Sequence, residues 1–316
     1  MSETAGIFER YKRNYFFVPL VAVFFLSRML LPGIRGVLRA ENDVLFVLVG
    51  MLFCVLLPNV LFFVALANKF PDRKIAALGA GSFFGRCGRA RLAFFVALGC
   101  VAAFAATLLV DCAISLASGL ADDASLVPVA SGTPDFWGVC AILLFDVLLC
   151  AFAEELFYRS TFREAFGTSG FWLAYAVAVF ALAHDNAADA FGALCVGSAA
   201  MLLLCQSGSL FAAMCAHGVY NLFAALSAAY IDFSWSAYAL MQKSTMAEEM
   251  IAHGLLVGAA GVALLAVSLI GILLVGAHAP RAEPASLPVR VDAANKIKYL
   301  LFLLFEAAWF ALMLFR

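Results

Sequence analysis

Long apolar runs separated by short polar segments follow one another along almost the whole chain. Nine runs are of spanning or near-spanning length: 15–31, 44–68, 92–118, 136–166, 170–184, 190–205, 209–231, 251–277 and 299–315. A helix needs about 20 mostly apolar residues to cross the hydrocarbon core of a bilayer. Most of the runs meet this length, and the two that begin at 170 and 190 must be partly buried among their neighbours. The pattern predicts an all-α, polytopic transmembrane helical bundle of eight to nine spans.

Composition supports the same fold class. Hydrophobic residues make up 65% of the 316 residues, charged residues make up 13%, and the mean hydropathy is +1.00. Soluble domains average roughly 45–50% apolar and about 25% charged residues. No polar stretch is long enough for a soluble domain, so we expect a single integral membrane domain over residues 1–316. The nine cysteines lie mostly in apolar runs without ligand spacing, and no basic, aromatic-interleaved patch indicates a nucleic-acid partner.

Charges in the connecting segments predict the orientation in the membrane. Segment 69–91 holds six basic residues and one acid, whereas segment 119–135 holds three acids and no base. Basic segments stay in the cytoplasm, so we expect a cytoplasmic N-terminus and, with nine spans, an outside C-terminus. The first run lacks a small-residue cleavage site and is expected to be retained as a helix. The plasma membrane is the expected location.

The fourth run ends in an unusually polar stretch, residues 153–159. Glu154, Glu155 and Arg159 lie there among apolar residues. Ionisable groups are costly at membrane depth, so they need a partner or a function. On a helix, Glu155 and Arg159 are four residues apart and share a face, whereas Glu154 is turned by about 100°. We therefore expect Glu155 to pair with Arg159 and Glu154 to face something else.

Two further polar sites lie downstream in equally apolar surroundings. His184 follows Phe180 by four residues, and Asn221 follows His217 by four, so each pair shares a helix face. At about 1.5 Å per residue, Glu154 and His184 both lie roughly 20 Å from the turn between their helices. The later pair lies roughly 12 to 18 Å along its own helix by the same rise. The count predicts that three helices project these side chains into one intramembrane cavity.

Such a set supports hydrolysis of an amide. The reaction needs an activated water, a proton donor for the departing amine, and donors aimed at the oxyanion. A desolvated Glu154 is a competent base, and His184 can hold the same water. His217 and Asn221 are donors of the kind that an oxyanion needs. The residues expected to support these four are Glu155, Arg159, Tyr158 and Phe180.

In chain order, the three motifs resemble those of the CAAX-processing and bacteriocin-processing intramembrane endopeptidases, the CPBP or Abi family. The motifs are Glu154-Glu155-x-x-x-Arg159, Phe180-x-x-x-His184 and His217-x-x-x-Asn221. The resemblance covers a motif-bearing core at about 136–231. It implies that Glu154 and His184 activate the water. It also implies that His217 and Asn221 hold the oxyanion.

The resemblance further implies an intramembrane protease of the glutamate type, in a family that has also been described as metal-dependent. No cofactor is predicted, and zinc is the alternative. The expected substrate is a membrane-associated or lipidated, CAAX-like peptide or protein, reached from the cytoplasmic side of the bilayer. Four other ionisable residues at membrane depth match no motif and are expected to act as packing or pairing charges. They are Arg28, Asp111, Asp146 and Glu306.

Other interpretations of the same residues stay open at this point. A zinc-dependent protease would take Glu154, His184 and His217 as ligands, although the H-E-x-x-H motif is absent. A rhomboid-type serine protease would pair Ser198 or Ser209 with His217, but neither serine has the expected glycine context. A transporter would relay protons through these groups, although no inverted repeat is apparent. A non-catalytic scaffold or immunity protein would keep them as polar contacts between helices.

Overall fold

The computed structural model describes most of the chain and none of the described residues is in a strand. The described residues are 3–30, 50–71, 83–85, 87–121, 140, 143–167, 169–184, 186–241, 246–277 and 293–314. The protein is an all-α helical membrane bundle, as the apolar runs predict, because an apolar chain in lipid must satisfy its backbone hydrogen bonds internally.

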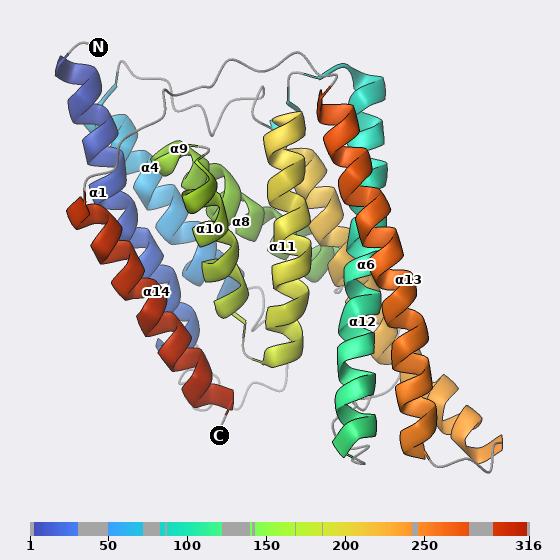
Figure 1. The fold of residues 1–316 in the computed structure, drawn as a ribbon. Helices are drawn as coiled ribbons and strands as arrows, with labels where there is room; N and C mark the ends of the chain where they lie inside the picture. Colours follow the sequence, from blue (N-terminus) through green and yellow to red (C-terminus); the bar gives the residue numbers. More distant parts are fainter. Residues whose placement is uncertain are drawn as a thin grey trace.

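Figure 1 shows the helices of the bundle, coloured in chain order. In chain order they are α1 (Glu3–Phe25) with the π-helical turn η1 (Leu26–Leu30), η2 (Gly50–Leu56) with α4 (Leu57–Lys69), α6 (Arg89–Ala121), η5 (Leu143–Cys150) with α8 (Ala151–Glu155), η6 (Leu156–Thr161) and α9 (Phe162–Phe166), α10 (Gly170–Leu182), α11 (Ala187–Ser207), α12 (Leu210–Met241), α13 (Met246–Ala277) and α14 (Ala293–Leu314). Each predicted run overlaps one continuous helical segment, and α12 continues beyond the predicted end at 231.

Four helical stretches in the described part of the chain are long and apolar enough to cross a membrane. They are Leu52–Lys69, Arg89–Ala121, Ala187–Ser207 and Glu248–Ala277. The segments 119–135 and 278–298, whose charges carry much of the orientation argument, lie largely outside the described residues. The number of spans, the orientation and the single-domain boundary therefore stay predictions.

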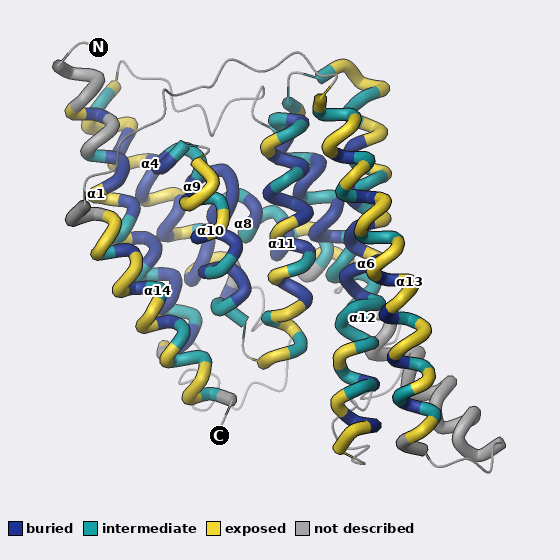
Figure 2. Tube along the Cα trace, viewed as in Figure 1, coloured by how far each residue is buried: buried dark blue, intermediate teal, exposed yellow. Residues whose placement is uncertain are grey.

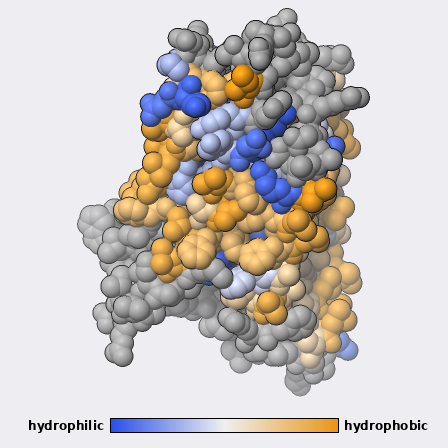
Figure 3. Space-filling view, turned by 90° about the vertical axis from the view of Figure 1, so that its left-hand side faces the viewer, coloured by the Kyte–Doolittle hydropathy of each residue, from blue (hydrophilic) through white to orange (hydrophobic). Residues whose placement is uncertain are grey.

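Lipid-facing and core-facing helices are clearly divided. Figure 2 shows buried residues gathered on α8, α10 and α11, whereas α13 and α14 expose much of their length. Exposed apolar side chains such as Val267 and Leu304 lie on these outer helices. Figure 3 shows apolar side chains covering much of the middle of one face. Apolar exposure on this scale is typical of a surface that contacts lipid.

The segment that carries the two glutamates is a helix of mixed pitch. The five residues of α8 lie between the π-helical turns η5 and η6. Such turns are frequent at functional sites. They change the direction in which the side chains after them point. No glycine or proline between 143 and 166 marks this change. The sequence argument assumed a regular α-helix over this segment. That assumption is wrong for the two π-helical turns, whose pitch differs from that of an α-helix.

Aromatic packing and one buried hydrogen bond hold this segment in place. Phe16 of α1 packs against Phe157, Phe162 and other rings of the same core. Thr161 donates to Asn59 Oδ1 of α4 at 2.7 Å, and both residues are fully buried. The helices α1 and α4 thus support one side of the segment, while α12 packs on it as well.

Candidate active site

A glycine allows α12 to approach the glutamate-bearing segment closely. A Cβ atom at Gly218 would lie 2.6 Å from the backbone oxygen of Val147 in η5, closer than real Cβ contacts allow. The bare backbone of Gly218 removes that clash. The preceding residue, His217, is thereby brought against α8.

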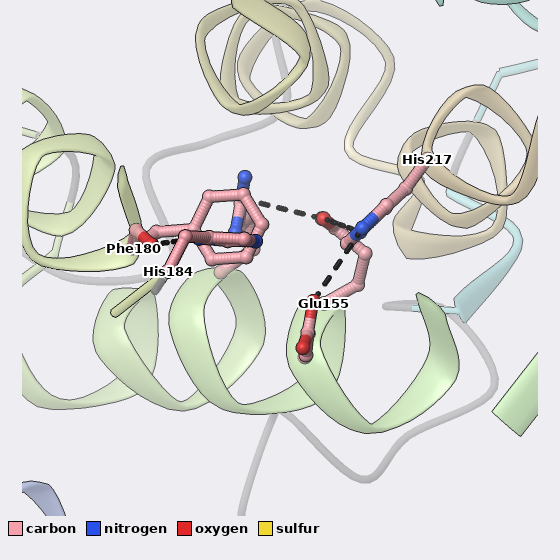
Figure 4. A network of polar contacts seen from close by, with 6 residues as sticks. Glu155, Phe180, His184 and His217 are labelled. Carbon is pink, nitrogen blue, oxygen red and sulfur yellow. Dashed lines mark hydrogen bonds and ion pairs between the residues drawn. The ribbon is translucent and has the colours of Figure 1, made fainter. Parts of the chain in front are cut away.

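His217 lies between the two carboxylates (Figure 4). Its Nδ1 is 2.9 Å from Glu155 Oε1, and its Nε2 is 3.5 Å from Glu154 Oε2. A carboxylate only accepts hydrogen bonds, so Nδ1–H donates to Glu155, while the second contact is longer than an ordinary hydrogen bond. The sequence argument separated the roles of Glu154 and Glu155. The structure gives both the same partner, because an imidazole has a nitrogen on each side.

Glu155 also forms the ion pair that the four-residue spacing predicts. Arg159 Nε lies 3.3 Å from Glu155 Oε2, and both side chains are at most 1% exposed. The guanidinium carbon lies 4.1 Å from the centroid of the Phe180 ring, a distance at which a cation and an aromatic face attract each other. A Cβ at Gly197 would lie 2.8 Å from Arg159 Nη2. This glycine of α11 therefore leaves the space that Arg159 occupies.

Phe180 joins the second motif to the third. Its ring packs edge to face against His184 and His217, with ring centroids 5.0 Å and 5.5 Å apart. His184 Nδ1 lies 2.9 Å from the backbone oxygen of Phe180. A carbonyl has no hydrogen to donate, so Nδ1–H must be the donor, and neutral His184 carries its lone pair on Nε2. Contacts thus join all three motifs.

Comparison with known protein families concerns this same part of the chain. Residues 136–223 match the family described as type II CAAX prenyl endopeptidase Rce1-like. This segment is similar to the Rce1-like CAAX endopeptidases. It includes every residue predicted for the site, from Glu154 to Asn221. No curated protein and no solved structure matches the chain significantly.

The long apolar helices make this chain an integral membrane protein, and its segment 136–223 is similar to endopeptidases of the CAAX type. The structure brings Glu154, Glu155 and His217 together, whereas the side chain of His184 is engaged with its own helix. Among the described residues, no hydrogen bond or ion pair joins His184 to Glu154.

The remaining predicted residues take different places in the Rce1-like segment. Asn221 lies one helical turn after His217 and is partly buried. Its assignment to the oxyanion stays a prediction. Tyr158, expected to support the site, is 5% exposed and packs between the rings of Phe157 and Phe180. Sequence reasoning missed the role of Gly197. The only sign of it in the sequence is that a glycine stands inside an apolar helix.

The alternative zinc site was tested against the same geometry. It would require Glu154, His184 and His217 to converge on one point. Within the described ranges, no group of three or more His, Cys, Asp and Glu side chains lies close enough to hold a metal ion. The donors as placed do not fit a zinc site.

Proposed function

We propose that the chain is an endopeptidase that hydrolyses a peptide bond of a lipidated, CAAX-like substrate with a water activated by Glu154. The observation that carries this proposal is the contact of His217 with two carboxylates, Glu154 and Glu155, inside an Rce1-like membrane segment. Two acids and one arginine in apolar surroundings are costly to maintain, which favours a chemical role.

Glu154 is the better base of the two glutamates. Glu155 is fully buried, and its two oxygens contact Arg159 and His217. Glu154 is 17% exposed, and its contact with His217 is long. Its carboxylate is therefore better placed to receive the proton of a water molecule. Arg159 and His217 keep Glu155 out of the proton transfer.

The other residues are proposed to place the water and the carbonyl. His184 uses Nδ1–H on its own helix, so its Nε2 accepts a hydrogen bond from the attacking water. His217 is proposed to act as an imidazolium, so that Nδ1–H donates to Glu155 while Nε2–H, together with the Asn221 amide, donates to the oxyanion of the tetrahedral intermediate. The proton taken up by Glu154 then passes to the departing amine as the C–N bond breaks. Each cleavage consumes one water molecule and yields one carboxyl group and one free amine.

We infer that the site is reached from the cytoplasmic side of the plasma membrane, because the basic connecting segments favour that orientation. We also propose that no cofactor is used. A prenylated C-terminal peptide is the substrate that fits the family best.

Cleavage assays in liposomes test this function. The purified chain is mixed with prenylated and unmodified peptides of the same sequence, with EDTA and without it. We expect cleavage of the prenylated peptide in EDTA, and a kcat about 10² to 10³-fold lower for Asn221→Ala, the typical effect of losing an oxyanion donor. Loss of activity in EDTA that zinc alone restores would replace the glutamate mechanism with a zinc mechanism. Absence of cleavage of either peptide would contradict the proposed function.

A further inference from the structure

Arg28 lies outside the Rce1-like segment but contacts the end of the helix that carries His184. It belongs to η1, at the end of the first helix, and is 8% exposed. Its Nη2 donates to the backbone oxygen of Leu182 at 2.7 Å and to the backbone oxygen of His184. A charged side chain at membrane depth therefore reaches a backbone position that is 156 residues away in the sequence.

The oxygen of Leu182 is one of those that a helix end leaves without partners, and the oxygen of His184 lies in the connection just after that end. The last carbonyls of a helix have no intrahelical donor and carry the negative end of its dipole. Here α10 ends at Leu182, Ala183 is its C-cap, and α11 begins only at Ala187. His184 thus lies in the connection between two helices. A cation that binds both oxygens fixes the path of the backbone at this point.

His184 is consequently held at two points. Arg28 holds its backbone oxygen, and the backbone oxygen of Phe180 holds its Nδ1–H. With these two points fixed, the direction of Nε2 is fixed as well. The ring of Phe180 packs against the imidazole and limits its rotation further.

The last helix places a buried carboxyl group within electrostatic reach of Arg28. This group belongs to Glu306 of α14, whose side chain is 3% exposed. Tyr158 of η6 lies within the electrostatic reach of both. A buried carboxylate near a buried guanidinium reduces the cost of keeping each of them in an apolar bundle. The first and last helices, which no motif covers, therefore meet the site at Arg28.

We propose that Arg28 is a positioning residue that orients His184 for catalysis. It acts through the backbone at the end of α10 and does not touch the substrate. This inference rests on the proposed function only in giving His184 a role with the attacking water. It extends the functional site from the Rce1-like segment to the terminal helices.

Arg28→Met tests the proposal by its effect on kinetics. Methionine keeps an unbranched apolar stem but removes the donors, so we expect kcat to fall about 10 to 100-fold, as for other residues that orient a functional histidine, with KM unchanged. Arg28→Lys should recover part of the loss, because an ammonium can donate to the same oxygens but lacks the planar fork. The initial rates are measured over a range of prenylated peptide concentrations in liposomes.

Arg13→Met is the matched control, since Arg13 is also a buried arginine and lies in α1, the helix that continues into η1. It lies 15 residues earlier, roughly 22 Å along the helix. We expect its kcat to stay close to that of the wild type. An unchanged kcat for Arg28→Met, or an equal fall for both variants, would overturn the proposal.

Nitrogen-15 NMR of labelled histidine gives a readout that does not need activity. The chain has four histidines, so the signal of His184 can be assigned as the one lost in His184→Gln. We expect a single Nδ1–H tautomer in the wild type and a mixture of tautomers in Arg28→Met. A single Nδ1–H signal in both would overturn the role of Arg28. If the wild type cleaves no peptide, the proposed function fails while this spectrum still decides the positioning.

Discussion

Glu154→Gln is expected to lower kcat for peptide cleavage by about 10² to 10⁴-fold, the range typical of a lost general base. Glutamine keeps the size and polarity of the side chain but does not take up a proton. The substitution should lower kcat without impairing folding, because Glu154 is 17% exposed and its contact with His217 is 3.5 Å long. Initial rates with saturating prenylated peptide in liposomes measure the effect.

Glu164→Gln is the control for removing a carboxylate from the same helical segment. Glu164 lies ten residues after Glu154 and pairs with Lys12 at 2.9 Å. We expect its kcat to stay close to the wild-type value. Equal losses for the two variants would show that any buried acid of this segment has the same effect, which contradicts a base at Glu154.

Arg159→Met is expected to have the largest effect on stability. The substitution leaves the charge of Glu155, whose side chain is 0% exposed, without its arginine. Breaking a buried ion pair by removing one partner costs about 3–5 kcal/mol. The contact of the guanidinium with the Phe180 ring is lost as well. The free energy of unfolding in detergent, measured with denaturant, should fall by about that amount, and cleavage should fall with it.

The double variant Glu155→Gln and Arg159→Met separates charge from packing. It removes both charges, so most of the lost stability should return. His217 would still lack its anionic partner, and activity should stay low. A double variant that is no more stable than Arg159→Met would show that packing against Phe180, and not the unpaired charge, dominates the effect.

The helices could be predicted from the sequence because one physical rule decides them. An apolar run in lipid must form a helix, and every predicted run overlaps one. The pair of Glu155 with Arg159 was also predictable, since residues four apart on a helix are neighbours. Both inferences need only local geometry.

The position of His217 was not predictable in the same way. It depends on how closely α12 approaches η5, and Gly218 against Val147 determines that distance. The π-helical turns beside α8 carry no glycine or proline as a marker. Interhelical packing and local pitch therefore decide which carboxylates share a partner, and neither follows from residue spacing.

Arg28 shows a further limit of sequence reasoning. As a single charge in an apolar run, it was expected to act as a packing or pairing charge. The structure shows that it binds the backbone oxygens of Leu182 and His184, at and just after the end of α10. An intramembrane charge indicates that a partner exists. It does not identify the partner, because the partner lies on a helix far away in the sequence.

The central claim is that Glu154 and His217 act on one reacting centre. Cleavage rates of Glu154→Gln, His217→Gln and the double variant test it most directly, because residues that act as a unit have strongly non-additive effects. We predict a kcat for the double variant close to that of the slower single variant. Fold-losses that multiply in the double variant would show that the two side chains act independently, and would contradict the claim.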